Sequence, residues 1–122
     1  PALDSSRGLG DVYKRQMMDD VLVCSCLVLA ANAEGRAIKT IESVAEGSQL
    51  SDVQEAFIDT GAIQCGFCTP GFLVAAATLL EENNNPSNDE IESALAGNLC
   101  RCTGYYSIIK SLRLSDKAGS DS

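Results

Sequence analysis

The spacing of apolar residues divides the chain into an amino part with strand-like runs and a carboxyl part with helical periodicity. Residues 20–45 carry Val, Leu and Ile in two stretches on either side of the segment AEGR, which predicts a β-hairpin or two neighbouring strands. Because two strands alone are marginally stable in water, this part is expected to be the remainder of a larger sheet. Residues 1–18 show no sustained period and are expected to form a disordered leader of doubtful origin.

From residue 48 onward the apolar residues recur at helical spacing, and four short helices are predicted. The first begins at Ser51, which has Gln54 three residues later as in a capping box, and it ends at Gly61. The second extends from about Pro70 to Glu82, with Thr69 as its amino-terminal cap.

The third and fourth helices follow the same rules. A second capping box, formed by Ser87 and Glu90, begins the third helix. The fourth helix places Ile108, Ile109 and Leu112 on one face, which is the spacing of a helix that buries one side.

These elements predict an α+β chain in which the helical part repeats itself. The order helix, cysteine pair, helix occurs twice, so two such units can pack about an approximate two-fold axis and bring the cysteine pairs together. The expected segments are the leader at 1–18, an incomplete β part at 19–46, a helical domain at 47–113 and a disordered tail at 114–122.

Composition and charge exclude several classes of function. The net charge is −8, and no basic stripe is present, so nucleic acid is not expected as a partner. No apolar run reaches the roughly 20 residues that a membrane-spanning helix needs. No secretory signal is visible, which favours the cytoplasm, where cysteine clusters bind metals or carry out redox chemistry. With three Phe, three Tyr and no Trp, the core is expected to be aliphatic.

Four of the six cysteines form two close pairs, each followed by a predicted helix. Cys65 and Cys68 have the spacing C-x2-C, and Cys100 and Cys102 have the spacing C-x-C. Free N–H groups at a helix amino end favour thiolates and an anionic metal–sulfur centre. By spacing alone, structural zinc and a 2Fe–2S cluster remain near even alternatives. Disulfides are a weaker alternative, because no secretory signal is visible.

The segments GAIQCGFCTPGF at 61–72 and GNLCRCTGYYSI at 97–108 resemble the signatures of the iron–sulfur subunit of molybdenum hydroxylases. This is the xanthine dehydrogenase, aldehyde oxidase and carbon monoxide dehydrogenase family. The segment CLVLAANAEGRAIKTIES at 26–43 is similar to the end of that family's plant-type, β-grasp ferredoxin domain. The resemblance covers about residues 20–113.

The resemblance implies a carboxyl four-helix domain that holds the 2Fe–2S cluster nearest the molybdenum. The four matching ligands are Cys65, Cys68, Cys100 and Cys102. Gln64 matches a residue that contacts the molybdopterin cofactor in the partner subunit, and Cys102 matches one that lies near the pterin. The implied partners are a molybdopterin-binding large subunit and an FAD-binding medium subunit.

The amino part departs from the family pattern. Cys26 matches the fourth ligand of a second 2Fe–2S cluster, but no cysteine precedes Cys24, so the other three ligands are missing. We therefore expect the second cluster to be absent and Cys26 to be a vestigial ligand in an amino-terminally truncated subunit. Cys24 is expected to be a small strand residue or an accidental thiol.

Three functions follow. In the first, the chain relays electrons from the molybdenum centre through 2Fe–2S towards FAD and performs no substrate chemistry itself. In the second, it is a zinc-stabilised binding module without a redox role. In the third, it is a nonfunctional fragment that folds only against partner subunits.

Overall fold

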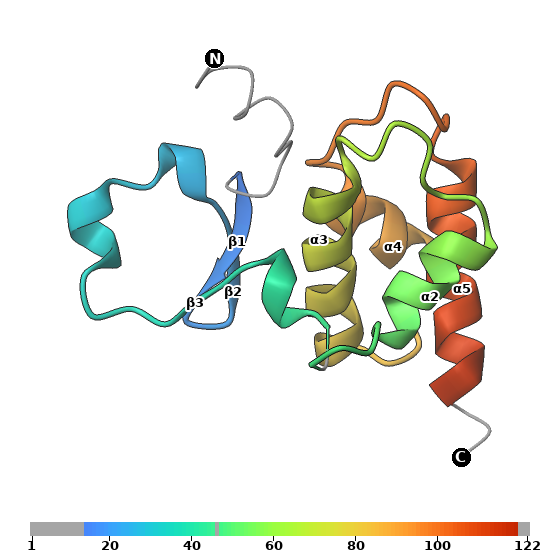
Figure 1. Ribbon diagram of the computed structural model, residues 1–122, viewed down its shortest axis with the longest axis horizontal. Helices are drawn as coiled ribbons and strands as arrows, with labels where there is room; N and C mark the ends of the chain where they lie inside the picture. The colour runs from blue at the N-terminus through green and yellow to red at the C-terminus, as the bar shows by residue number, and fades with distance from the viewer. Residues whose placement is uncertain (1–13, 46, 120–122) are drawn as a thin grey trace.

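The computed structural model describes residues 14–45 and 47–119 of the chain. A small antiparallel sheet lies on one side, and a bundle of four helices lies on the other (Figure 1). This mixture of helices with a small sheet confirms the expected combination of the two element types. The approximate two-fold symmetry of the helical part stays a prediction.

Three short strands make up the sheet. They are β1 (Arg15–Met18), β2 (Val21–Cys24) and β3 (Ile38–Lys39), in the order β2-β1-β3, and both pairings are antiparallel. Two single-turn helices, η1 (Ser25–Leu27) and η2 (Ala30–Ala33), connect β2 to β3.

The position of the hairpin corrects two predictions. The strands β1 and β2 pair around Asp19 and Asp20, so β1 lies inside the segment expected to be a disordered leader. The prediction is therefore wrong for Arg15–Met18, while residues 1–13 lie outside the described part. The hairpin predicted around AEGR is also displaced, because the turn between β1 and β2 precedes that segment by more than ten residues.

The turn residues explain why the chain reverses there. Asp19 and Asp20 have φ angles of 52° and 65°, a left-handed conformation that Asp tolerates better than most residues. The carboxylate of Asp19 accepts hydrogen bonds from the guanidinium of Arg36 at 2.7 Å and from the backbone N–H of Ala37 at 2.9 Å. The hydrogen bond from Arg36 is the main reason that the pKa of Asp19 lies below its ordinary value. These bonds fasten the start of β3 to the hairpin.

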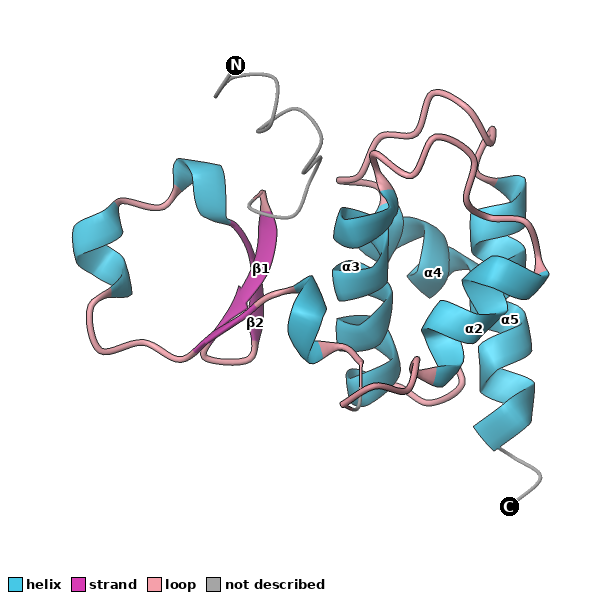
Figure 2. Cartoon of the chain, in the orientation of Figure 1, coloured by secondary structure: helices cyan, strands magenta, loops and turns pink. Residues whose placement is uncertain are grey.

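The four predicted helices are confirmed. They are α2 (Asp52–Asp59), α3 (Thr69–Glu82), α4 (Asn88–Leu95) and α5 (Tyr106–Gly119). A single-turn helix, η3 (Ile41–Ser43), precedes them. Helix α3 occupies the middle, between the sheet and the other helices (Figures 1 and 2).

Both predicted capping boxes are present. The backbone N–H of Ser51 donates to Gln54 Oε1 at 2.8 Å, and that of Ser87 donates to Glu90 Oε2 at 2.7 Å. These bonds satisfy donors that a helix start would otherwise leave without partners.

Two predicted helix ends differ from the structure. Thr69 was expected to cap α3, but Cys68 is the cap and Thr69 is the first helical residue, because the turn at Gly66 brings the chain into the helix one residue earlier. The disordered tail expected at 114–122 is wrong through Gly119, since α5 continues to that residue. Residues 120–122 lie outside the described part.

The core is mainly aliphatic, as expected, and two aromatic rings are buried within it. Phe57 of α2 and Phe72 of α3 are both 0% exposed. They pack with apolar residues from every helix and with the loop residues Ala62 and Cys68; the others in this cluster are Val53, Leu73, Ala75, Ala76, Ile91, Leu95, Ile108 and Leu112. Because α3 is buried on nearly every side, its position fixes the ends of the neighbouring loops.

A long-range hydrogen bond connects the sheet to the loop after α4. Arg15 Nη2 donates to the carbonyl oxygen of Gly97 at 2.8 Å. A Cβ atom at Gly97 would lie 1.9 Å from that nitrogen, so a larger residue here would displace the Arg15 guanidinium. This bond holds the segment that leads into Cys100.

Removing this bond is expected to lower the free energy of unfolding by about 1 kcal/mol, the net value of one hydrogen bond. Arg15→Met removes the donor, and Gly97→Ala displaces it. Because both changes remove the same bond, Arg15→Met should cost less in the Gly97→Ala background than in the wild type. Urea denaturation of the four proteins measures this, and fully additive costs would contradict the contact.

Candidate metal centre

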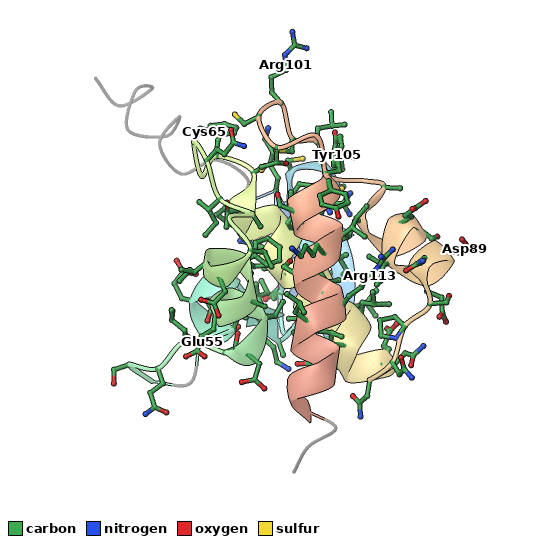
Figure 3. The ribbon with its side chains drawn as sticks, turned by 90° about the vertical axis from the view of Figure 1, so that its right-hand side faces the viewer. Glu55, Cys65, Asp89, Arg101, Tyr105 and Arg113 are labelled. Carbon is green, nitrogen blue, oxygen red and sulfur yellow. The ribbon has the colours of Figure 1, made fainter. Side chains whose placement is uncertain are left out.

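The two cysteine motifs lie in two loops at the same end of the helical bundle. The loop between α2 and α3 carries Cys65 and Cys68, and the loop between α4 and α5 carries Cys100 and Cys102 (Figure 2). Figure 3 shows Cys65 and Tyr105 at this end of α5, with Arg101 pointing away from the bundle. Segments 35 residues apart in sequence are thus brought together, as the motif repetition predicts.

The first loop is shaped by one buried residue and two glycines. Helix α2 ends where Gly61 adopts φ +66° and the backbone N–H of Ala62 donates to the carbonyl of Phe57 at 2.9 Å. Ala62 is 1% exposed, so it anchors the loop in the core. Gly66 adopts φ +79°, a conformation that glycine accepts without steric cost, and turns the chain between Cys65 and Cys68.

The sulfur of Cys68 lies at the amino end of α3. Cys68 is the cap residue of this 14-residue helix and is 7% exposed. Burial is the main cause that raises the pKa of the Cys68 thiol to about 12, and its hydrogen bond to Cys100 acts in the same direction. Without a metal, Cys68 is therefore a thiol that donates a proton to the neighbouring sulfur.

The second loop closes around Cys100 through Thr103 and Tyr105. The Thr103 hydroxyl lies 3.0 Å from Cys100 Sγ, and the Thr103 backbone N–H donates to the same sulfur at 3.5 Å. The backbone N–H of Cys100 donates to the Tyr105 hydroxyl at 3.1 Å. Tyr105 has φ +69°, which is rare for a bulky residue, so several contacts must hold it there.

One of these contacts joins the second loop to the core. The ring of Tyr105 packs edge-on against Phe72 of α3, with centroids 6.2 Å apart and planes at 62°. Such an edge-to-face pair is favourable beyond its burial alone. Because Phe72 lies one turn after Cys68, this contact sets the distance between the two cysteine loops.

The four cysteines are free thiols, and across the two loops Cys68 influences the pKa of Cys100 and Cys65 influences that of Cys102. Partial burial opposes ionisation of Cys100, but hydrogen bonds from Thr103, from the Cys102 backbone and from Cys68 together outweigh it and lower its pKa to about 7. The hydrogen bond to Cys65 raises the pKa of Cys102. Among Cys68, Cys100 and Cys102, the thiol of Cys100 therefore ionises most readily.

A cavity of about 390 Å³ lies beside three of the four cysteines, and its lining consists of Cys65, Phe67, Cys68, Leu99, Cys100, Arg101 and Tyr105. Four cysteine sulfurs from two loops are the donor set that a 2Fe–2S cluster uses. The cavity, the donor set and the ionisable Cys100 fit such a cluster. Among the described residues, no three His, Cys, Asp or Glu side chains gather around one point as ligands of a single ion would.

The other residues singled out in the sequence lie apart from this cavity or on its rim. Gln64 is exposed and directly precedes Cys65, so its amide is open to a partner. Cys26 is exposed in η1, and Cys24 is half-buried in β2. Both belong to the sheet side of the chain, so the structure does not bring them to the four helical cysteines (Figure 1).

Two residues of the site were missed from the sequence. Thr103 and Tyr105 both contact Cys100, yet neither was assigned a role. A signal existed for Thr103, because a hydroxyl three residues after a capped or liganding position commonly bonds back to it. No local signal indicates that the Tyr105 hydroxyl meets the backbone of Cys100.

Comparison with known proteins agrees with this site. Residues 40–113 match the family model described as a 2Fe-2S binding domain. The small subunit of nicotine 6-hydroxylase from Paenarthrobacter nicotinovorans is 52% identical over 96 residues, which are 79% of this chain and 58% of that protein. The xanthine dehydrogenase iron-sulfur-binding subunit of Escherichia coli O157:H7 is 47% identical over 98 residues, covering 79% of this chain and 62% of that one.

A solved structure shows the same fold. Quinoline 2-oxidoreductase from Pseudomonas putida 86 matches with a TM-score of 0.82 and 39% identity, over 94% of this chain and 72% of that one. The chain spans about three fifths of the length of the two curated relatives named above, 58% of the first and 62% of the second. In the described part of the chain, none of the helices is long and apolar enough to cross a membrane.

Proposed function

The chain belongs to the 2Fe-2S binding domain family, among the small iron–sulfur subunits of the xanthine dehydrogenase and aldehyde oxidase family, and we propose that it relays electrons. In this proposal Cys65, Cys68, Cys100 and Cys102 hold one 2Fe–2S cluster, which passes electrons from a molybdenum centre towards FAD. The cluster supplies one-electron chemistry, and this chain performs no substrate chemistry.

The observation that carries the proposal is the convergence of the two cysteine loops around one cavity. Each loop is held by the core, through Ala62 and Cys68 on one side and the Tyr105 ring on the other. Rigid attachment matters for electron transfer because the ligands need not reorganise when the charge changes.

The protein's own groups have defined tasks in this relay. The amino end of α3 places positive partial charge near Cys68, and the Thr103 N–H and hydroxyl do the same for Cys100. Burial of Cys68 limits access of water to that side of the cavity. These interactions favour thiolate ligands and a stable anionic centre.

The exposed side of the cavity suits a partner subunit. Leu99 is 79% exposed and Tyr106 is 76% exposed, and Ile63 and Phe67 add further apolar surface at this end. Apolar surface of this kind commonly marks an interface. We propose that a molybdopterin-binding large subunit covers this apolar surface. In that complex Gln64 contacts the molybdopterin cofactor and Cys102 lies near the pterin. An FAD-binding medium subunit accepts the electrons, and the whole complex is cytoplasmic.

Metal analysis of the full chain, purified without air, tests the proposal. We expect about two irons per chain, a brown colour and a visible spectrum that bleaches on reduction with dithionite. One zinc and no colour would instead support a zinc-stabilised module. About four irons would show a second cluster, contrary to the expectation that Cys26 has too few partners.

A further inference from the structure

The threonine at position 103 touches the sulfur of Cys100 with two different donors. Its backbone N–H lies 3.5 Å from Cys100 Sγ, and its hydroxyl oxygen lies 3.0 Å from the same atom. Thr69 follows the other cysteine pair in the same way, but its Oγ1 is buried and has no hydrogen-bond partner among the residues that the structure describes. The two threonines therefore occupy equivalent sequence positions with different contacts.

The direction of the Thr103 hydroxyl bond follows from its neighbours. The backbone N–H of Tyr105 donates to Thr103 Oγ1 at 3.2 Å, so one lone pair of that oxygen is already used. A liganding cysteine is a thiolate and has no proton to give. When Cys100 is a metal ligand, the Thr103 hydroxyl must therefore be the donor and the Cys100 sulfur the acceptor of this hydrogen bond.

The backbone around this hydroxyl is held by independent contacts. The Tyr105 hydroxyl accepts the N–H of Cys100 at 3.1 Å, and the Tyr105 ring packs against Phe72 in the buried core. Tyr105 keeps φ +69° and Gly104 keeps φ +65°, which fold the chain back onto Cys100. The hydroxyl is thus oriented before any cluster binds.

Provided that the chain holds the cluster proposed above, we propose that Thr103 is a positioning residue whose hydroxyl donates to Cys100 Sγ and raises the reduction potential of the centre. One-electron reduction would make such a centre one unit more negative, and its sulfur ligands would share part of that charge. A hydrogen bond to such a sulfur stabilises the more negative state more than the less negative one. The Tyr105 N–H acts with it by fixing the orientation of the hydroxyl.

The experiment compares Thr103→Val with Thr103→Ser in the full chain, by titrating the reduced-cluster EPR signal against ambient potential. Val has nearly the same shape as Thr but lacks the donor, so its midpoint potential should shift downwards. Ser keeps a hydroxyl and should restore the wild-type value. Thr69→Val is the matched control and should leave the potential unchanged, because the Thr69 hydroxyl bonds to no sulfur in the described part of the chain.

A second measurement covers the case in which Thr103→Val does not load iron. In D2O, the reduced wild-type cluster should show hyperfine couplings to two exchangeable deuterons beside the sulfur, one on the Thr103 hydroxyl and one on the Thr103 backbone nitrogen, and Thr103→Ala should lose the first and keep the second. If the wild type holds a cluster, but all variants have equal potentials and Thr103→Ala shows the same deuteron couplings as the wild type, the role of Thr103 alone is overturned. A colourless wild type without iron would overturn both this role and the proposed function.

Discussion

Cys100→Ser is expected to leave less than about a tenth of the wild-type iron on the chain and to abolish the brown colour. A serine hydroxyl stays protonated at neutral pH and is a poor ligand for iron. Cys100 is also the sulfur whose surroundings favour ionisation, because the backbone N–H of Thr103 donates to it and this and other hydrogen bonds lower its pKa to about 7. Iron analysis and the visible spectrum of anaerobically purified protein measure the result.

Cys26→Ser is the control for this change. Cys26 is exposed in η1, on the sheet side of the chain, and lies apart from the helical cysteines. Its replacement should leave iron content and colour at the wild-type level. Full iron in Cys100→Ser would show that the ligand set is wrong, and loss of iron in Cys26→Ser would show that a cluster binds at the sheet.

Phe72→Ala is expected to lower the free energy of unfolding by about 3–5 kcal/mol, which is a large share of the 5–15 kcal/mol typical of a whole domain. Phe72 is 0% exposed, and the shortened side chain would leave a cavity between α3 and its neighbours. The same change removes the ring on which Tyr105 packs, so the loop of Cys100 should loosen as well. Urea denaturation gives the first effect, and the rate of iron loss to a chelator gives the second.

Phe67→Ala is the matched control, since it changes the same residue type five positions earlier in the chain. Phe67 is 49% exposed and lies on the rim of the cavity. Its replacement should cost less than about 1 kcal/mol, as is usual for exposed positions. Equal losses of stability in the two variants would mean that Phe72 does not occupy the centre of the core.

The helical half of the chain was readable from the sequence because its signals are local. The capping boxes at Ser51 and Ser87 depend on residues three positions apart, and both formed. The apolar spacing in the last helix likewise predicted the burial of Ile108 and Leu112. The cysteine motifs were equally clear, since their spacing and flanking residues lie within a few positions of each other.

The sheet half was predicted poorly because strand pairing depends on distant partners. Nothing in the four residues Arg15–Met18 marks them as a central strand, and their order comes from pairing with β2 and β3 and from packing on α3. The bond from Arg15 to Gly97 spans 82 positions, which no local pattern could reveal. The turn was missed because an Asp–Asp pair is a weaker turn signal than a pair with glycine.

The sequence by itself determined the number of α-helices, the capping-box starts of α2 and α4 and the identity of the candidate sulfur ligands, because each depends on residues close together in the chain. Only the tertiary structure decided which sulfurs face each other, which one has hydrogen-bond donors and where the exposed rim lies. Those properties depend on how α3 positions the two loops, through burial of Cys68 and the packing of Tyr105 on Phe72. Contacts between residues far apart in sequence carry no local signature, and they set the chemistry of the site.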